Sequence, residues 1–126
     1  MVIHAKKFIE ESKNVENYRA RGKVERMSAE RMIAGPAIPM IYDYMKTKYD
    51  DLARVLEEEG KDVNKLKSAD IIECGLERGD PLCMLVVEKF TEWLGVEAGN
   101  LALKTLPTGG IYLIGGVTQG IHKYII

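Results

Sequence analysis

The chain of 126 residues has few of the side chains that most catalytic and metal-binding sites require. It contains two histidines and two cysteines, and no HExxH, Cys2His2 or EF-hand spacing occurs. His4 and His122 lie near opposite ends of the chain without a neighbouring nucleophile pattern, so a Ser-His or Cys-His mechanism has no support. We therefore predict no catalytic residue and no metal-binding residue in this chain.

An excess of one charge is also absent, because 18 basic residues are balanced by 19 acidic ones, for a formal net charge of -1. This balance gives no reason to expect a nucleic-acid partner or a charge-driven contact with a membrane. The chain has no run of about 18 apolar residues and no secretory signal, so we expect a soluble, cytoplasmic protein. In a reducing compartment Cys74 and Cys83 are expected to be free thiols.

One short run is rich in β-branched and aromatic side chains. It is Ile-Tyr-Leu-Ile at residues 111–114, between the pairs Gly109-Gly110 and Gly115-Gly116. The run is too short for a helix, so we predict a buried strand over about residues 110–114 that ends in a tight turn, with a helix opening after residue 120. Such a turn leaves backbone N–H groups accessible to a ligand, although glycine pairs after strands also occur for conformational reasons alone.

Helical periodicity of apolar side chains covers most of the remaining chain. The longest predicted helix spans about residues 81–106, with Asp80 as N-cap and Pro81 at the first helical position. Shorter helices are predicted at 2–13, at 29–34 with Ser28 as N-cap, after Gly35-Pro36, at 51–59, and at 69–78 with Ser68 as N-cap. The expected fold class is therefore α/β and helix-rich.

Glu30 is the carboxylate with the most suggestive position. It falls in the first turn of a predicted helix, just before the corner that Gly35 and Pro36 impose on the chain. An ionised carboxylate can accept hydrogen bonds from two ligand hydroxyls, which suits recognition of a polyol. Glutamate is also favoured in first turns by the helix dipole alone, so the sequence leaves both roles open.

Three segments in order resemble landmarks of the bacterial-type glucokinases. They are Met-Ser-Ala-Glu-Arg-Met-Ile-Ala-Gly-Pro at 27–36, Gly-Asn-Leu-Ala-Leu at 99–103 and Thr-Gly-Gly-Ile-Tyr-Leu-Ile-Gly-Gly-Val at 108–117. The resemblance implies that residues 1–126 are a single partial domain, the middle part of the large domain of an actin-like, ribonuclease-H-like sugar kinase. The uncapped start of the helix predicted at 2–13 agrees with a chain that begins inside an element.

The resemblance also implies roles for four residues. Glu30 corresponds to the glutamate that hydrogen-bonds glucose, and Gly115 and Gly116 correspond to the adenosine motif, with Val117 in place of the usual isoleucine. Ala37, in place of a second glycine, and Thr-Gln-Gly at 118–120, in place of a proline and a basic residue, depart from the family pattern. The parent protein is then expected to use ATP with Mg2+ to phosphorylate glucose to glucose 6-phosphate.

Several family motifs are missing from the sequence: the Asp-x-Gly-Gly-Thr strand turn, the Asn-Asp that holds the catalytic base, the Gly-Thr-Gly phosphate loop and the Gly-Glu-Gly-Gly-His sugar segment. Phosphoryl transfer needs such groups together, so this chain is expected to be inactive alone. Two alternatives stay open: a catalytically inactive helical interaction module and a kinase for another hexose. A homodimer is a possible assembly.

Overall fold

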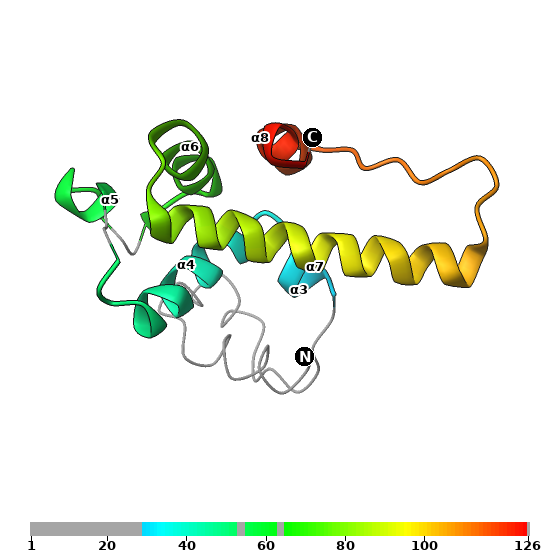
Figure 1. Ribbon diagram of the computed structural model, residues 1–126, viewed down its shortest axis with the longest axis horizontal. Helices are drawn as coiled ribbons and strands as arrows, with labels where there is room; N and C mark the ends of the chain where they lie inside the picture. Colours follow the sequence, from blue (N-terminus) through cyan, green and yellow to red (C-terminus); the bar gives the residue numbers. More distant parts are fainter. Residues whose placement is uncertain (1–28, 53–54, 63–64, 126) are drawn as a thin grey trace.

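The computed structural model describes residues 29–52, 55–62 and 65–125 (Figure 1). The predicted helix at 2–13 and the predicted cap Ser28 lie outside these residues. The described part contains only helices: α3 Glu30–Ile33, α4 Ala37–Lys48, α5 Val55–Glu58, α6 Ser68–Arg78, α7 Pro81–Thr105 and α8 Gly116–Ile125. The helix-rich character predicted from the sequence is confirmed.

Helix α7 is the central element, and α3, α4, α6 and α8 pack on it. It begins where the sequence predicts, because Asp80 accepts a hydrogen bond from the Cys83 N–H at 2.8 Å and Pro81 needs no N–H partner. It ends before Leu106, whose φ of 45° is left-handed, so the helix predicted at 81–106 is confirmed. In the described residues, no helix has the combined length and apolar character needed to cross a membrane.

The hydrophobic core lies between α4, α6 and the first half of α7 (Figure 1). Each fully buried aliphatic or aromatic side chain contributes about 1.5–3 kcal/mol relative to its exposed state, so this cluster is the main source of stability. Its largest fully buried members are Ile38, Met40, Ile41, Tyr42, Leu56, Ile71, Leu82, Val86, Phe90 and Ile121.

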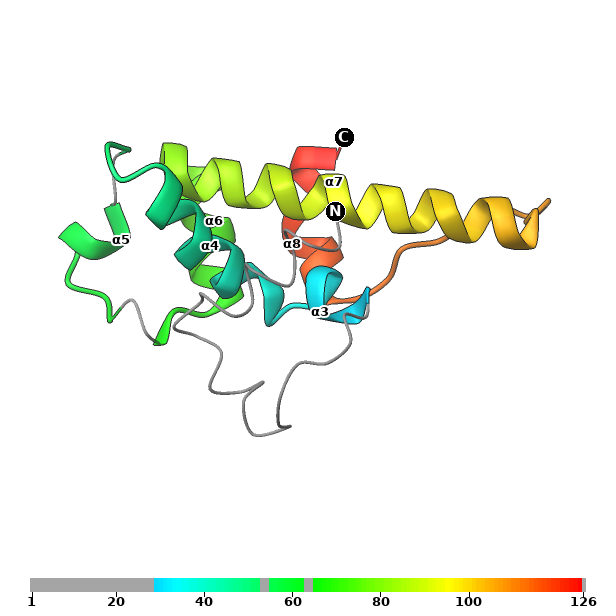
Figure 2. The ribbon, with the colours of Figure 1, turned by 90° about the horizontal axis from the view of Figure 1, so that it is seen from below.

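The second half of α7 and the segment that follows it extend away from the other helices (Figure 2). Several apolar side chains are exposed there, including Leu103 at 78% and Leu106 at 75%. The contrast with the buried first half shows that the described residues cover the apolar face of α7 only over that first half.

The strand predicted over about residues 110–114 is wrong. These residues form an irregular segment between α7 and α8, with Tyr112 83% exposed and Ile114 90% exposed. A strand needs main-chain hydrogen bonds to a neighbouring strand, and the described residues contain no such partner. Local bonds occur instead, from the Gly110 N–H to the Pro107 carbonyl at 3.1 Å and from the Tyr112 hydroxyl to the Gly109 carbonyl at 3.1 Å. The α/β prediction therefore fails for the described chain.

Three helix boundaries also differ from the prediction. The helix predicted at 51–59 is the shorter α5, and α8 begins at Gly116 rather than after residue 120. Ser68 is the first residue of α6 instead of its cap, and Asp70 accepts from the Lys67 N–H at 3.2 Å. Gly79 ends α6 as predicted, with a left-handed φ of 71°.

Candidate functional site

Glu30 begins α3, a single helical turn, and its side chain is exposed. The turn is closed by the Met32 and Ile33 N–H groups, which donate to the Ala29 carbonyl at 2.9 and 3.1 Å. Gly35 and Pro36 follow at once, and α4 begins at Ala37, so the predicted corner is confirmed. The carboxylate of Glu30 is thus held near a fixed corner and is accessible from solvent.

Gly115 and Gly116 are the point at which the exposed segment becomes a helix. Gly115 has a φ of 121°, a backbone conformation that residues other than glycine rarely adopt. Its carbonyl accepts a hydrogen bond from the Gln119 N–H at 3.0 Å. Gly116 and Val117 lie in the first turn of α8, and the half-buried Val117 packs on the core. The predicted adenosine residues therefore form a helix start.

The corner after Glu30 and the start of α8 meet in space. A Cβ atom placed on Gly35 would lie 3.2 Å from Cγ2 of Val117, closer than a side chain normally approaches. The Ser68 hydroxyl, at the start of α6, donates a 2.6 Å hydrogen bond to the Gly35 carbonyl. The segments predicted to bind sugar and adenosine are thus brought together at Gly35, although Gly35 and Val117 are far apart in the sequence.

A groove of about 500 Å3 lies between α6 and α8 and includes two of the three predicted adenosine residues, Gly116 and Val117. A Cβ atom on Gly120 would lie 3.4 Å from Cδ1 of Ile72, an ordinary van der Waals distance, so α8 packs against α6 at this point. The floor is apolar, from Ile72, Leu76 and Val117, and the volume falls in the range of about 300–1,000 Å3 that small-molecule sites occupy.

The α6 wall of the groove was not predicted from the sequence as part of a site. The sequence did contain an indication of this wall, because the apolar side chains of α6 occupy two faces of the helix rather than one. Ile71 and Cys74 are buried in the core, and Ile72, also a core residue, lines the groove towards α8 together with Leu76, four residues later. A helix with two apolar faces must contact two partners, which here are α7 and α8.

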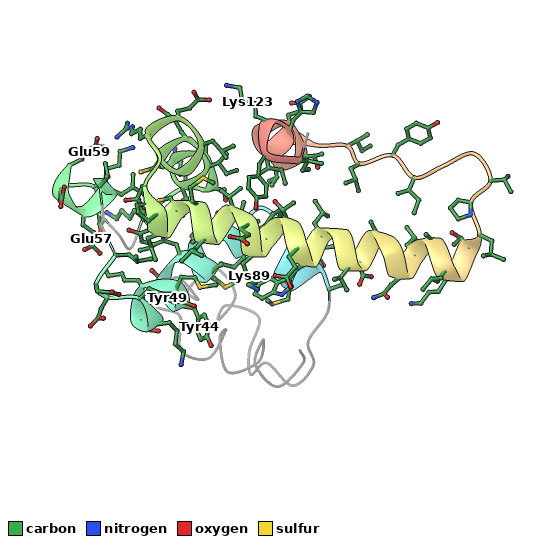
Figure 3. All side chains as sticks on the ribbon, in the orientation of Figure 1. Tyr44, Tyr49, Glu57, Glu59, Lys89 and Lys123 are labelled. Carbon is green, nitrogen blue, oxygen red and sulfur yellow. The ribbon has the colours of Figure 1, made fainter. Side chains whose placement is uncertain are left out.

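Two glutamates of α6 give the groove a polar edge. Glu77 pairs with Lys123 of α8, with 2.6 Å between Oε1 and Nζ, and Lys123 extends from the side of α8 nearest α6 (Figure 3). Glu73 lies 3.9 Å from Nη2 of Arg78, a longer contact. Both carboxylates are more than half exposed, at 62% for Glu73 and 54% for Glu77, so ligand hydroxyls or amines can reach them.

A separate buried cluster joins the end of α6 to the start of α7. The sulfur atoms of Cys74 and Cys83 and a carboxylate oxygen of Asp80 lie within 4.8 Å of one another. Burial raises the pKa of both thiols, so they are protonated at neutral pH. Both oxygens of Asp80 already accept backbone hydrogen bonds, from Cys83 at 2.8 Å and Val55 at 3.0 Å. Magnesium prefers oxygen ligands, so this cluster does not suit Mg2+.

The chain has recognisable relatives over most of its length. The family model described as Glucokinase matches residues 7–126. A glucokinase of Nostoc punctiforme is 34% identical over 112 residues, which cover 81% of this chain and 33% of that protein. A glucokinase of Synechocystis sp. is 35% identical over 108 residues, covering 76% of this chain and 30% of that protein. A glucokinase of Neisseria meningitidis is 31% identical, covering 83% and 29% respectively.

The matches cover only part of each relative, because this chain spans about one third of their length. No solved structure matches the chain. The family match covers all three segments on which the resemblance was based, including Glu30, Gly115, Gly116 and Val117. The chain therefore belongs to the glucokinase family.

Proposed function

We propose that the whole protein is an ATP-dependent glucokinase that converts glucose to glucose 6-phosphate, and that this chain forms one wall of its sugar site and one wall of its adenosine site. The observation that carries the proposal is the contact of Gly35 with Val117, which places the corner after Glu30 against the start of α8. A phosphoryl transferase must hold donor and acceptor side by side, so adjacency of these segments supports the assignment.

In this proposal Glu30 accepts hydrogen bonds from two hydroxyls of glucose. An exposed, ionised carboxylate beside a rigid corner can orient a sugar without further charge. A single carboxylate does not distinguish sugar epimers, so the alternative is a kinase that acts on another hexose.

The adenosine part of ATP would lie in the groove between α6 and α8. Ile72, Leu76 and Val117 provide apolar surface for a flat ring, and Gly116 and Gly120 line the same groove. The departures from the family pattern at Thr118 and Gln119 fall in α8, beside this groove.

Transfer of the phosphoryl group needs a general base, amides that cradle the phosphates and Mg2+. The Cys74, Asp80 and Cys83 cluster does not suit magnesium, and the sequence contains none of the family's phosphate loops. We expect the 126-residue chain to bind its ligands but not to catalyse transfer of the phosphoryl group. A coupled assay of glucose 6-phosphate formation should give background rates, and robust turnover would contradict the assignment of this chain as a partial domain.

The sugar role is tested by Glu30→Gln in the full-length enzyme. The exchange keeps the size and one acceptor oxygen but removes the charge, which weakens hydrogen bonds worth roughly 1.5–3 kcal/mol each. We expect kcat/KM for glucose to fall by about ten- to a hundredfold, with the KM for ATP and the Tm nearly unchanged. Glu58→Gln, an exposed glutamate of α5, is the matched control. Equal losses for glucose and ATP would show that Glu30 is structural.

The second candidate is a catalytically inactive helical module that forms a homodimer. The exposed apolar residues of α7 and of the segment after it, Leu101, Leu103, Leu106 and Ile114, favour this reading. Light scattering separates the two. A discrete dimer whose Tm responds to neither glucose nor ATP would favour the module, whereas stabilisation by either ligand would favour the kinase.

A further inference from the structure

The groove between α6 and α8 has two chemically different ends. At one end Ser68 of α6 and Val117 of α8 both contact Gly35. At the other end Glu77 of α6 pairs with Lys123 of α8. The two helices therefore run side by side in the same direction, and Figure 1 shows both nearly end-on.

This arrangement gives the two ends of the groove opposite electrostatic preferences. The first turns of α6 and α8, with their outward N–H groups, lie at the Gly35 end, where the helix dipoles favour negative charge. The carboxylates of Glu73 and Glu77 lie further along α6, where they favour hydrogen-bond donors and repel phosphate. A nucleotide is favoured in one direction only, with phosphates towards Gly35 and hydroxyl groups towards the glutamates.

We propose that Glu73 holds the ribose of the bound nucleotide by accepting hydrogen bonds from its 2′- and 3′-hydroxyls. This inference rests on the proposed function, because it takes the groove as the nucleotide site. Two vicinal hydroxyls match the two oxygens of one carboxylate, and acidic side chains recognise ribose in this way in dinucleotide-binding folds. Glu73 makes the site selective for ribonucleotides over deoxyribonucleotides.

Glu73 is better suited to this role than Glu77. The Glu77 carboxylate is held by Lys123 at 2.6 Å, and this ion pair joins α6 to α8 at the end of the groove. The Glu73 carboxylate lies 3.9 Å from Arg78, whose guanidinium also donates to Glu59 in the turn after α5. Glu73 can therefore turn towards a ligand without breaking a contact between the two walls.

The test uses the 15N-labelled chain and three probes: adenosine, 2′-deoxyadenosine and 2′,3′-dideoxyadenosine. Amide shifts of Gly116 and Gly120 report binding in the groove and give the dissociation constants. We expect adenosine to bind roughly three- to tenfold more tightly than 2′-deoxyadenosine, with a further loss for the dideoxy compound, since hydrogen bonds to an exposed carboxylate are of moderate strength.

The variant Glu73→Ala should weaken adenosine to the level of 2′,3′-dideoxyadenosine and leave the dideoxy compound unchanged. Glu88→Ala, an exposed glutamate on α7, is the matched control and should preserve the full series. Equal affinities of the three probes for the unchanged chain would overturn the role of Glu73 while leaving the groove as the nucleoside site. Absence of shifts at Gly116 and Gly120 with adenosine would overturn the nucleotide site itself.

Discussion

The Ser68 hydroxyl donates a 2.6 Å hydrogen bond to the main-chain carbonyl of Gly35, 33 residues earlier in the chain. This bond fixes the start of α6 to the corner that follows Glu30, and Val117 packs on the same glycine. The predicted sugar segment, the predicted adenosine segment and the groove therefore share one junction.

Removing this hydroxyl should loosen the junction. We expect Ser68→Ala to lower the free energy of unfolding by about 0.5–1.5 kcal/mol, because the partly buried Gly35 carbonyl loses its donor. Thr47→Ala is the control, since the Thr47 hydroxyl donates to the nearby Tyr44 carbonyl at 2.7 Å on an exposed surface. Urea unfolding measures the stability of both variants. Equal losses would mean that the bond to Gly35 contributes no more to the free energy of unfolding than an exposed local hydrogen bond.

The contact between α6 and α7 depends on a glycine. A Cβ atom on Gly75 would lie 3.0 Å from the carbonyl carbon of Cys83 and 3.1 Å from its oxygen, which are rigid backbone atoms. We expect Gly75→Ala to destabilise the protein by about 1–3 kcal/mol through overpacking. Gly95→Ala in α7, where a Cβ atom meets nothing within 4 Å, should instead stabilise it by about 0.5–1 kcal/mol. Thermal unfolding that moves both variants in the same direction would contradict this packing.

Stability should depend on pH through Asp70. The Lys61 ammonium donates to Asp70 at 3.0 Å and holds the pKa of that carboxyl below its ordinary value. A lowered folded pKa means that the stabilisation is complete above the unfolded pKa of about 3.9 and is lost as pH falls through the folded pKa. Since both side chains are about one third exposed, the effect should stay below about 1 kcal/mol.

The Lys61→Ala variant checks this dependence. Its free energy of unfolding should be lower than that of the unchanged chain at pH 7, and the difference between the two should shrink towards pH 3. A difference that stays constant over this range would show that Lys61 acts through packing rather than through the charge of Asp70.

The two cysteines should be unreactive in the folded chain. Cys74 and Cys83 are both buried and free, and burial raises the pKa of each thiol, so little thiolate is present at pH 8. Mass spectrometry after iodoacetamide treatment should show almost no modification without denaturant and two additions per chain in denaturant. Rapid native modification of one thiol would mean that the junction of α6 and α7 opens readily.

Local chemistry in the sequence was sufficient for several elements. Asp80 and Pro81 define the start of α7, Gly79 ends α6, and Gly35 with Pro36 makes the corner before α4. These features depend on one residue and its immediate neighbours, so they can be predicted without knowing the partners. The glucokinase resemblance, carried by three short segments, is likewise confirmed by the family match.

Tertiary structure decided what depends on distant partners. Residues 111–114 have the composition of a strand, but pairing requires a neighbouring strand, and in the described residues that segment is exposed and irregular. Ser68 has the side chain of a cap, yet its hydroxyl donates to Gly35. The groove lies between α6 and α8, whose residues Ile72 and Gly120 are near each other in space although they are far apart in the sequence. Sequence by itself determined the start of α7, the end of α6 and the corner before α4, whereas contacts between distant residues decided which surfaces face one another and hence where a ligand can bind.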